Sequence, residues 1–505
     1  LLKPRVRSIM QIRRSMLLSA LDRYAVMALS LTTTAVAARL LTPAEIGTFV
    51  VGGALFMVAD ALRDFGVSVY LIQERELTRA KVRAAFTVTL ASSCLLALFF
   101  YAAAPAIASF YDEARLANVV YFAAAGLLVV PFGGTLVSLM RRDMAFGRVA
   151  VVNVAGAASN LAAVCLLAPL GFGYLSLVWG MVATSVVCAL AACLLRPSFW
   201  AFRPAFSGWS AIVRFGGYSS ATTLINTAYQ LLPQMALGRI LGFDAVAFFS
   251  RSALLCQLPE RGVVSAIQPV VLPALSAHAR AGADMRAPYL HGITLMTVAH
   301  WPFLGALAVM AEPTVRVLLG DQWLAAVPLV QVLSIAYLAL APSFLTYPLL
   351  VSLGRIQDTL SLTLVSVPLS MAVVIGSASF GLLAMCASFL LLAPLQMYLA
   401  FRFIRRHVPF SWPDLARAVW RSAVVTLGST GACAATVALV GDATDSPLLL
   451  LAAGGLAAAA GWSGCLVLVR HPVRQEIAVA WSALRHLFGG LGRTSTPPLR
   501  AETTS

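Results

Sequence analysis

The sequence has little charge and almost no lysine. Only 11% of its 505 residues are charged and 60% are hydrophobic, and lysine occurs only at Lys3 and Lys81. Because a soluble domain carries about 25% charged residues, this composition excludes an ordinary soluble protein. Apolar runs of about 18 or more residues recur along the chain, each long enough to cross a bilayer. We therefore predict an all-α polytopic membrane protein.

The sequence also lacks the motifs of catalysis and metal binding. It has no GxxxxGK[ST] phosphate loop, which excludes ATP hydrolysis by the chain itself. Its six histidines are scattered, and its eight cysteines lie in apolar segments without a CxxC pair. We interpret these cysteines as buried apolar side chains, neither metal ligands nor disulfides. The sequence predicts no enzyme, cofactor or metal site, so transport would draw on an ion gradient, the membrane potential or the solute's own gradient.

The net charge of +16 follows a topology pattern, so it does not indicate nucleic-acid binding. We predict fourteen spans, at roughly 19–41, 46–72, 84–109, 117–140, 149–168, 173–195, 213–238, 244–272, 289–311, 326–352, 359–379, 382–404, 418–440 and 447–469. With the N-terminus inside, 28 basic residues fall in inner segments and four in outer ones. This asymmetry predicts that both termini are cytoplasmic, with a first span that is retained rather than cleaved.

The chain contains a duplication. The stretch from Ala38 to Phe49 is repeated, at an offset of about 200, from Gly238 to Phe249. Pro105 with Pro313 and Phe172-Gly173 with Phe380-Gly381 extend the match at an offset of about 208. We predict two parallel six-helix repeats around a central cavity, plus an extra C-terminal helix pair. The predicted divisions are 1–18 (basic N-terminus), 19–195 (first lobe), 196–212 (linker), 213–404 (second lobe), 418–469 (extra pair) and 470–505 (cytoplasmic tail).

Polar side chains form a stripe on the first helix of each repeat. In the seventh span they are Ser219, Thr223, Asn226, Gln230 and Gln234, and the equivalent positions of the first span are Ser19, Arg23, Ser30 and Thr34. Such residues often only hydrogen-bond neighbouring helices. Because the two stripes match in height, we favour a water-filled cavity lined by both.

Charged side chains inside the spans are the candidate site residues. Asp60, Arg63 and Asp64 share one face of the second span, while Arg251 and the pair Glu260-Arg261 lie in the eighth. An isolated charge at the bilayer centre costs at least about 2.5 kcal/mol, so these groups must face each other, water or a ligand.

Two interpretations of this charged set stay open. The carboxylates Asp60, Asp64 and Glu260 could serve ion coupling, or Asp60 could form a purely structural pair with Arg63. For Arg251 and Arg261 we favour function, because a guanidinium suits phosphate oxygens and stays charged when desolvated. Arg23, beside Asp22, could instead anchor the topology.

Several stretches resemble a known family. Ala38 through Gly47 resembles the first-loop signature of Wzx-type oligosaccharide-lipid exporters, the bacterial polysaccharide flippases. Phe65 through Gln73 and Phe248 through Ser276 resemble it too. These exporters belong to the multidrug/oligosaccharidyl-lipid/polysaccharide (MOP) exporter superfamily. The resemblance covers about 15–405 and is most specific in 38–73 and 237–276.

The resemblance implies two six-helix lobes that flip undecaprenyl-diphosphate-linked oligosaccharides across the bacterial inner membrane. The diphosphate would meet cavity cations, which map here to Arg63, Arg251, Arg261 and Arg23. A polysaccharide polymerase and glycosyltransferases would be partners. Alternatives are a drug antiporter coupled to H⁺ or Na⁺ through Asp60 and Glu260, a polysaccharide-assembly scaffold that translocates nothing, and a flippase of peptidoglycan precursors.

Overall fold

The computed structural model describes residues 3–205, 231–264, 284–441 and 444–478, with single residues between them at 209, 212, 216, 227, 275 and 278. These residues form helices and turns and contain no strand. Eleven of the described helices are long and apolar enough to span a membrane. The predicted count of fourteen is not confirmed. The predicted first span lies in α1 (Lys3–Leu40), which is not among the eleven, and the seventh and eighth lie partly outside the described residues.

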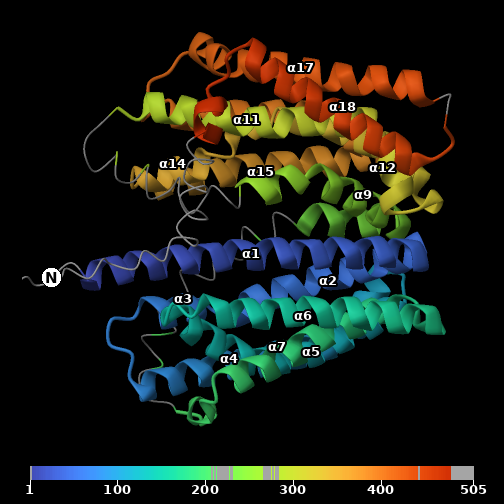
Figure 1. Cartoon of the computed structure of the whole chain (residues 1–505). Coiled ribbons are helices and arrows are strands. Elements are labelled where there is room, and N and C mark those ends of the chain that lie inside the picture. Colours follow the sequence, from blue (N-terminus) through green and yellow to red (C-terminus); the bar gives the residue numbers. More distant parts are fainter. Residues whose placement is uncertain are drawn as a thin grey trace, which may run out of the picture.

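The first group of helices packs around α5 and α6 (Figure 1). It comprises α1, α2 (Pro43–Asp64), α3 (Val67–Gln73), α4 (Arg79–Tyr111), α5 (Arg115–Arg142), α6 (Phe146–Leu167), η1 (Ala168–Phe172), α7 (Tyr174–Leu195) and η2 (Phe199–Phe202). We call these helices the N-terminal bundle. Its second helix begins at a capping box, in which Thr42 and Glu45 bond each other's backbone amides and Pro43 opens the first turn.

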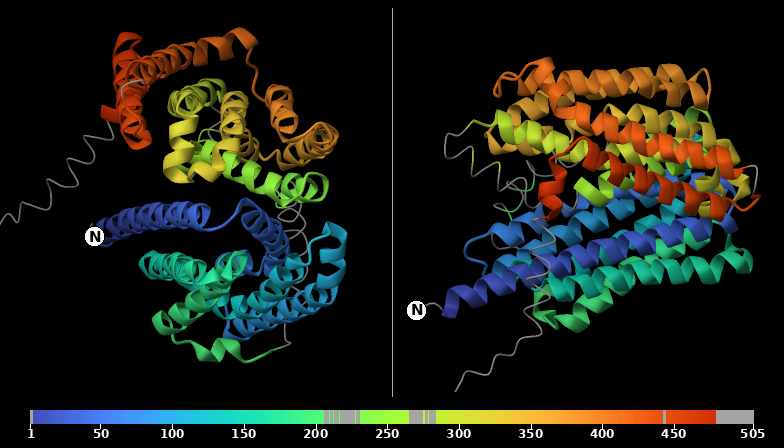
Figure 2. Two further views of the ribbon diagram at one scale, coloured as in Figure 1. Left: turned by 90° about the vertical axis from the view of Figure 1, so that its right-hand side faces the viewer. Right: turned by 45° about the horizontal axis from the view of Figure 1, so that its top comes forward.

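The second group lies on the other side of α1 (Figure 1). It comprises α9 (Phe243–Cys256), η3 (Glu260–Val264), α11 (Arg286–Val309), α12 (Ala311–Leu318), η4 (Asp321–Ala326), α13 (Val327–Leu338), η5 (Ala341–Ser343), α14 (Thr346–Ser352), α15 (Ile356–Ala378) and α16 (Leu382–Ile404). We call these the C-terminal bundle. Seen end-on, the two bundles form separate layers, and α17 (Trp412–Val440) and α18 (Pro447–Leu468) pack on α11 and α12 (Figure 2). The predicted domain boundaries and membrane orientation stay predictions.

Three predicted spans are not continuous helices. The span 46–72 breaks at Phe65 and Gly66, which both have positive φ, because the glycine tolerates that conformation. The span 244–272 leaves the α-helix after Cys256 and continues from Glu260 as one π-helical turn. The span 326–352 is interrupted between α13 and α14. Because the sequence of each span is hydrophobic on both sides of its interruption, hydrophobicity alone did not predict the three breaks.

The two bundles meet at the end where α1 finishes. A single apolar core there contains residues of both bundles, including Ala38, Ile46, Val246 and Trp323. The Trp323 indole Nε1 donates to the Ala38 carbonyl at 2.7 Å, and Gln322 Nε2 donates to the same oxygen. We call this end of the molecule the joined end.

The arginines Arg39 and Arg239, at the start of the duplicated stretches, also lie at the joined end. Arg39 donates to the Val317 carbonyl, and the guanidinium of Arg239 lies over the Phe110 ring. Both arginines therefore contact protein at the end of the bundles, outside the cavity described below.

The C-terminal helix pair carries a buried histidine just beyond α18. His471 is 1% exposed, its Nδ1 accepts from the Val473 amide at 3.2 Å, and its Nε2 lies 3.2 Å from the Ser422 hydroxyl. Burial, together with nearby Arg421 and His291, lowers the pKa of His471 to about 4. The ring is therefore neutral near pH 7 in the folded protein.

This lowered pKa predicts an acid-sensitive contact. An unfolded histidine has a pKa of about 6.5, so between about pH 6.5 and 4 the unfolded chain binds the proton and the folded chain does not. Stability therefore falls as the pH drops through this window. We expect His471→Gln to reduce the loss of melting temperature between pH 8 and 5 in detergent, relative to the native chain. An equal loss in both proteins would contradict the assignment.

Candidate functional site

A polar cavity of about 390 Å³ lies between α1 and the C-terminal bundle. Its polar and charged lining residues are Arg23, Ser30, Thr34, Gln234, Ser250, Arg251, Gln257 and Arg261. Six of the residues predicted from sequence, namely Arg23, Ser30, Thr34, Gln234, Arg251 and Arg261, are therefore brought together in one cavity. We call it the cationic cavity, because its described lining includes three arginines and no carboxylate.

One face of α1 forms the wall of this cavity on the side of the N-terminal bundle. Arg23, Met27, Ser30 and Thr34 recur every three or four residues, so their side chains lie above one another on a continuous helix. The neighbouring carboxylate of Asp22 points elsewhere, because its Oδ2 accepts a hydrogen bond at 2.8 Å from Asn153 in α6. Asp22 is therefore not among the described residues that line the cavity.

The opposite wall comes from α9 and the turn that follows it. Arg251 Nε is fully enclosed and has no hydrogen-bond partner in the described part of the chain. Beyond the end of α9, the guanidinium of Arg261 donates to Gln257 Oε1 at 3.2 Å. The helix α9 ends at Cys256, and Arg261 is carried by the π-helical turn η3. Such turns are frequent at functional sites.

One hydrogen bond bridges the cavity walls near Arg23 and Arg261. The Tyr24 hydroxyl donates to the Gly262 carbonyl at 3.2 Å, which joins α1 to η3. Tyr24 is itself 44% exposed.

The other predicted charged residues lie outside the lining of the cavity. Arg63 is buried and pairs with Asp60 at 2.8 Å, the structural pair that the sequence allowed. Asp64 accepts from the Ser68 hydroxyl at 2.6 Å, and Glu260 is partly buried in η3, which packs against α11. Their role in ion coupling, and that of Arg63 in phosphate binding, stay predictions.

Four predicted lining residues, Ser219, Thr223, Asn226 and Gln230, lie outside the described residues. Sequence reasoning missed two others, Ser250 and Gln257. The spacing of Gln257, four residues before Arg261, was a usable signal for a shared helical face. Ser250 offered no signal beyond its position next to Arg251.

A larger apolar cavity of about 620 Å³ adjoins the cationic cavity. Its walls come from α9, α11, α12, α17 and α18, and include Pro302, Leu307, Met310 and Trp462. Leu258 lines both cavities, so they adjoin at this side chain. A polar site and an apolar site thus lie side by side.

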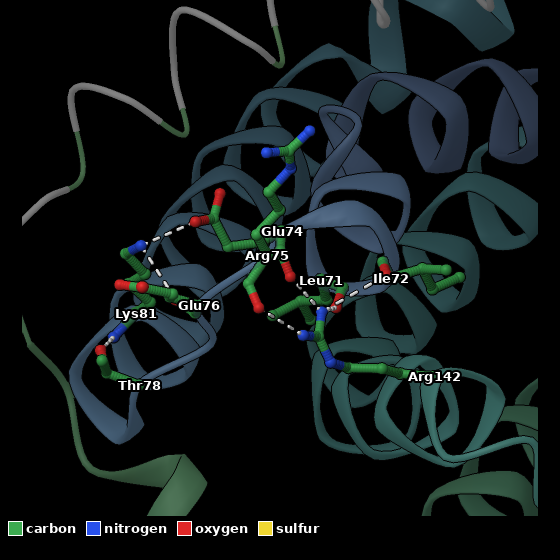
Figure 3. A network of polar contacts seen from close by, with 8 residues as sticks. All are labelled: Leu71, Ile72, Glu74, Arg75, Glu76, Thr78, Lys81 and Arg142. Carbon is green, nitrogen blue, oxygen red and sulfur yellow. Dashed lines mark hydrogen bonds and ion pairs between the residues drawn. The ribbon is translucent and has the colours of Figure 1, made fainter.

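At the end of α5, an arginine holds the short helix α3 in place (Figure 3). Arg142 Nη1 donates to the carbonyls of Leu71, Ile72 and Glu74, and its Nη2 to that of Arg75. These carbonyls have no partner within the helix, so the guanidinium acts as a C-terminal cap. The Glu74 carboxylate accepts from Lys81 Nζ at 2.7 Å, and this hydrogen bond lowers the pKa of Glu74.

Removal of this cap should destabilise the N-terminal bundle. We expect Arg142→Ala to lower the free energy of unfolding by about 2 kcal/mol, the value of about one hydrogen bond to a charged group, because the four carbonyls share one partly exposed guanidinium. Arg142→Lys should be intermediate, because an ammonium cannot span several carbonyls in one plane. Thermal unfolding in detergent measures the change. Arg141→Ala is the neighbouring control, and an equal effect of both alanine variants would refute the capping role.

The fold matches two solved membrane transporters. The lipid II flippase MurJ in an inward closed conformation has a TM-score of 0.70 at 10% identity, covering 90% of this chain and 99% of that one. An inward-facing multidrug resistance MATE family transporter of the MOP superfamily has a TM-score of 0.59 at 17% identity, covering 77% and 98%. The protein is thus a multi-pass membrane protein with a fold similar to those of MurJ and the MATE transporter.

The sequence comparison gives the family. The polysaccharide biosynthesis protein family matches residues 36–328, and the chain belongs to this family. It is 22% identical to the teichuronic acid biosynthesis protein TuaB of Bacillus subtilis, over 55% of this chain and 58% of TuaB. It is 21% identical to the lipopolysaccharide biosynthesis protein WzxC of Escherichia coli, over 63% of this chain and 65% of WzxC. It is 25% identical to the succinoglycan biosynthesis transport protein ExoT of Rhizobium meliloti, over 67% and 68%.

Proposed function

We propose that the protein flips polyprenyl-diphosphate-linked oligosaccharide repeat units across the bacterial inner membrane, for exopolysaccharide, capsule or O-antigen synthesis. The observation that carries the proposal is the cationic cavity beside an apolar one. A lipid-linked oligosaccharide has an anionic diphosphate between a polar glycan and a long apolar chain. The cationic cavity would suit the diphosphate and the adjacent sugars, and the apolar cavity beside it would suit the apolar chain.

The arginines of the cationic cavity are proposed to bind the diphosphate. The Nε of Arg251 is enclosed and has no hydrogen-bond partner among the described residues, while Arg23 and Arg261 face the same space from the two walls. Guanidinium groups bind phosphate oxygens through paired hydrogen bonds and remain charged without water. The described lining contains no carboxylate that would repel an anion. The hydroxyls and amides of Ser30, Thr34, Gln234 and Gln257 would then meet the first sugars.

The size of the cavities limits what can be enclosed. A volume of about 390 Å³ is within the range of about 300–1,000 Å³ that is common for small-molecule sites. It accommodates a diphosphate and adjacent sugar groups, but not a long glycan. The polyprenyl chain would occupy the apolar cavity next to Leu258 and continue into the lipid.

Transport would proceed by alternating access between the two bundles. The joined end is closed by a shared core and by hydrogen bonds from Gln322 and Trp323, whereas the described contacts at the other end of the cavity include the hydrogen bond from Tyr24 to Gly262. In the proposed orientation, with both termini in the cytoplasm, the joined end faces outward. The cargo would therefore enter past Tyr24. The coupling ion, H⁺ or Na⁺, and the glycosyltransferase and polymerase partners belong to the same proposal.

Reconstitution tests this function directly. Proteoliposomes would contain the full chain and a fluorescent undecaprenyl-diphosphate oligosaccharide, with an impermeant quencher added outside. Flipping makes nearly all of the label accessible, whereas protein-free vesicles expose only the outer leaflet. If several candidate glycans remain protected, the flippase proposal fails. Uptake of a cationic drug in the same vesicles would indicate a drug antiporter, and translocation of neither would indicate a scaffold.

A further inference from the structure

A histidine inside the C-terminal bundle has no partner for either ring nitrogen. His300 lies in α11 and is 2% exposed, and among the described residues neither Nδ1 nor Nε2 has a hydrogen-bond partner. The Met296 carbonyl, one turn earlier, lies beside the ring but outside hydrogen-bonding geometry. Enclosed polar atoms are normally paired, so an orphaned imidazole calls for a specific explanation.

The ring packs directly on a broken helix. The centroid of the His300 ring lies 5.1 Å from that of Phe344, which follows η5 in the interruption between α13 and α14. The next residue, Trp301, donates from its indole Nε1 to the Leu338 carbonyl at 2.8 Å, where α13 ends. Two consecutive residues of α11 thus contact both sides of the interruption.

The interruption is held by short-range backbone bonds. The amides of Ala339, Leu340, Ser343 and Phe344 donate to carbonyls only three residues earlier. Such bonds have poorer geometry than those of an α-helix. If this segment opens, the carbonyls of Leu340 and Ala341 lose their donors and become available to another group.

Among the residues that the structure describes, no charged group bonds the ring of His300. The titratable or charged side chains on α11 and on the elements packed against it are Arg286, Tyr289, His291, Glu260, Arg261, Glu312, Arg316, Tyr337, Asp414, Arg417, Arg421, Cys433 and Cys465. None of them forms a hydrogen bond with the ring. Because an unpaired buried cation is very unfavourable, the ring is neutral here.

We propose that His300 is a proton-binding site and that its protonation opens the interruption between α13 and α14. An imidazolium donates from both nitrogens, and the freed carbonyls of Leu340 and Ala341, or water admitted beside them, supply acceptors. Since the closed state holds a neutral ring and the open state a charged one, a lower pH favours opening. The inference does not depend on the cargo, and its test needs none.

Hydrogen–deuterium exchange of the full chain in nanodiscs tests the proposal. The measured peptide covers residues 339–346, and its exchange is corrected for the intrinsic pH dependence of amide exchange. Measurements at about pH 5 and about pH 8 bracket the ordinary titration of histidine. Binding of one proton can shift opening by up to about tenfold per pH unit, so we expect at least tenfold faster corrected exchange at the lower pH.

Variants separate proton binding from packing. His300→Phe keeps a ring against Phe344 and His300→Gln keeps a polar group, and both should abolish the pH response. His291→Gln should retain it, because His291 is exposed on the same helix and pairs with Glu476 at 3.4 Å. Trp301→Phe should speed exchange at both pH values and keep the response. An unchanged corrected rate in the native chain, or a response that persists in His300→Phe, overturns the proposal.

Discussion

Replacing Arg251 with alanine should reduce flipping of a diphosphate-linked oligosaccharide by about 10- to 100-fold, because each hydrogen bond to a charged group is worth about 1.5–3 kcal/mol. Arg251 is the cavity arginine whose Nε is enclosed and without a partner. Removing it takes away both a positive charge and a planar donor pair from the cationic cavity. The proteoliposome quenching assay described above gives the rate.

Two further variants make this result specific. Arg251→Lys keeps the charge but loses the planar fork, so we expect an intermediate rate. Arg115→Ala removes an arginine outside the cavity that is half exposed and 3.8 Å from Glu113, and should leave the rate unchanged. Native flipping by a correctly folded Arg251→Ala protein would show that the cationic cavity does not bind the diphosphate. An equal loss in Arg115→Ala would point to a general charge effect.

The second large effect is expected from a single methyl group at the joined end. An ideal Cβ at Gly47 would lie 1.9 Å from the Phe243 carbonyl oxygen, so α2 and α9 can approach only because position 47 is glycine. Overpacking costs about 1–3 kcal/mol, and every 1.4 kcal/mol changes a population about tenfold. Gly47→Ala should therefore lower the population closed at this end by about 5- to 150-fold.

This effect differs from a loss of folding. Alanine favours helix over glycine, so α2 itself should become more stable while the contact with Phe243 is lost. Spin labels at Arg115 and Phe380, one exposed residue from each bundle at the joined end, would report longer distances by pulsed electron resonance. Gly53→Ala is the matched control, because no atom lies within 4 Å of its Cβ. Unchanged distances in Gly47→Ala would mean that the closure adapts to the added methyl group.

Much of the architecture could be predicted from local sequence. Hydrophobic runs locate helices because each backbone polar group in a bilayer must bond within its own segment. The expected helices at 382–404 and 447–469 lie within a residue of α16 and α18. The polar stripe of the first span was also predictable, because a helix repeats every 3.6 residues whatever it packs against. Arg23, Ser30 and Thr34 accordingly share one wall of the cavity.

The partners of each charged residue depended on the tertiary structure. Spacing alone placed Asp60, Arg63 and Asp64 on one face, but it could not say whether that face meets the cavity. In the structure Arg63 pairs with Asp60. The cavity is lined instead by Arg251 and Arg261 of the C-terminal bundle, together with Arg23 of α1. Side chains 200 residues apart meet only through packing, which a periodic pattern along one helix does not encode.

The sequence by itself determined a helical membrane protein with intramembrane arginines and a duplicated helix–turn–helix stretch. The tertiary structure decided where the helices break, which arginines converge and how the duplicated stretches meet. The breaks at Phe65, Gln257 and Ala339 lie inside hydrophobic runs that conceal them, and at the third of them Trp301 of α11 donates to the Leu338 carbonyl. Gly47 is an example. The sequence shows that position 47 is glycine, but only the structure shows that α9 packs so closely there that a Cβ would collide with the Phe243 carbonyl.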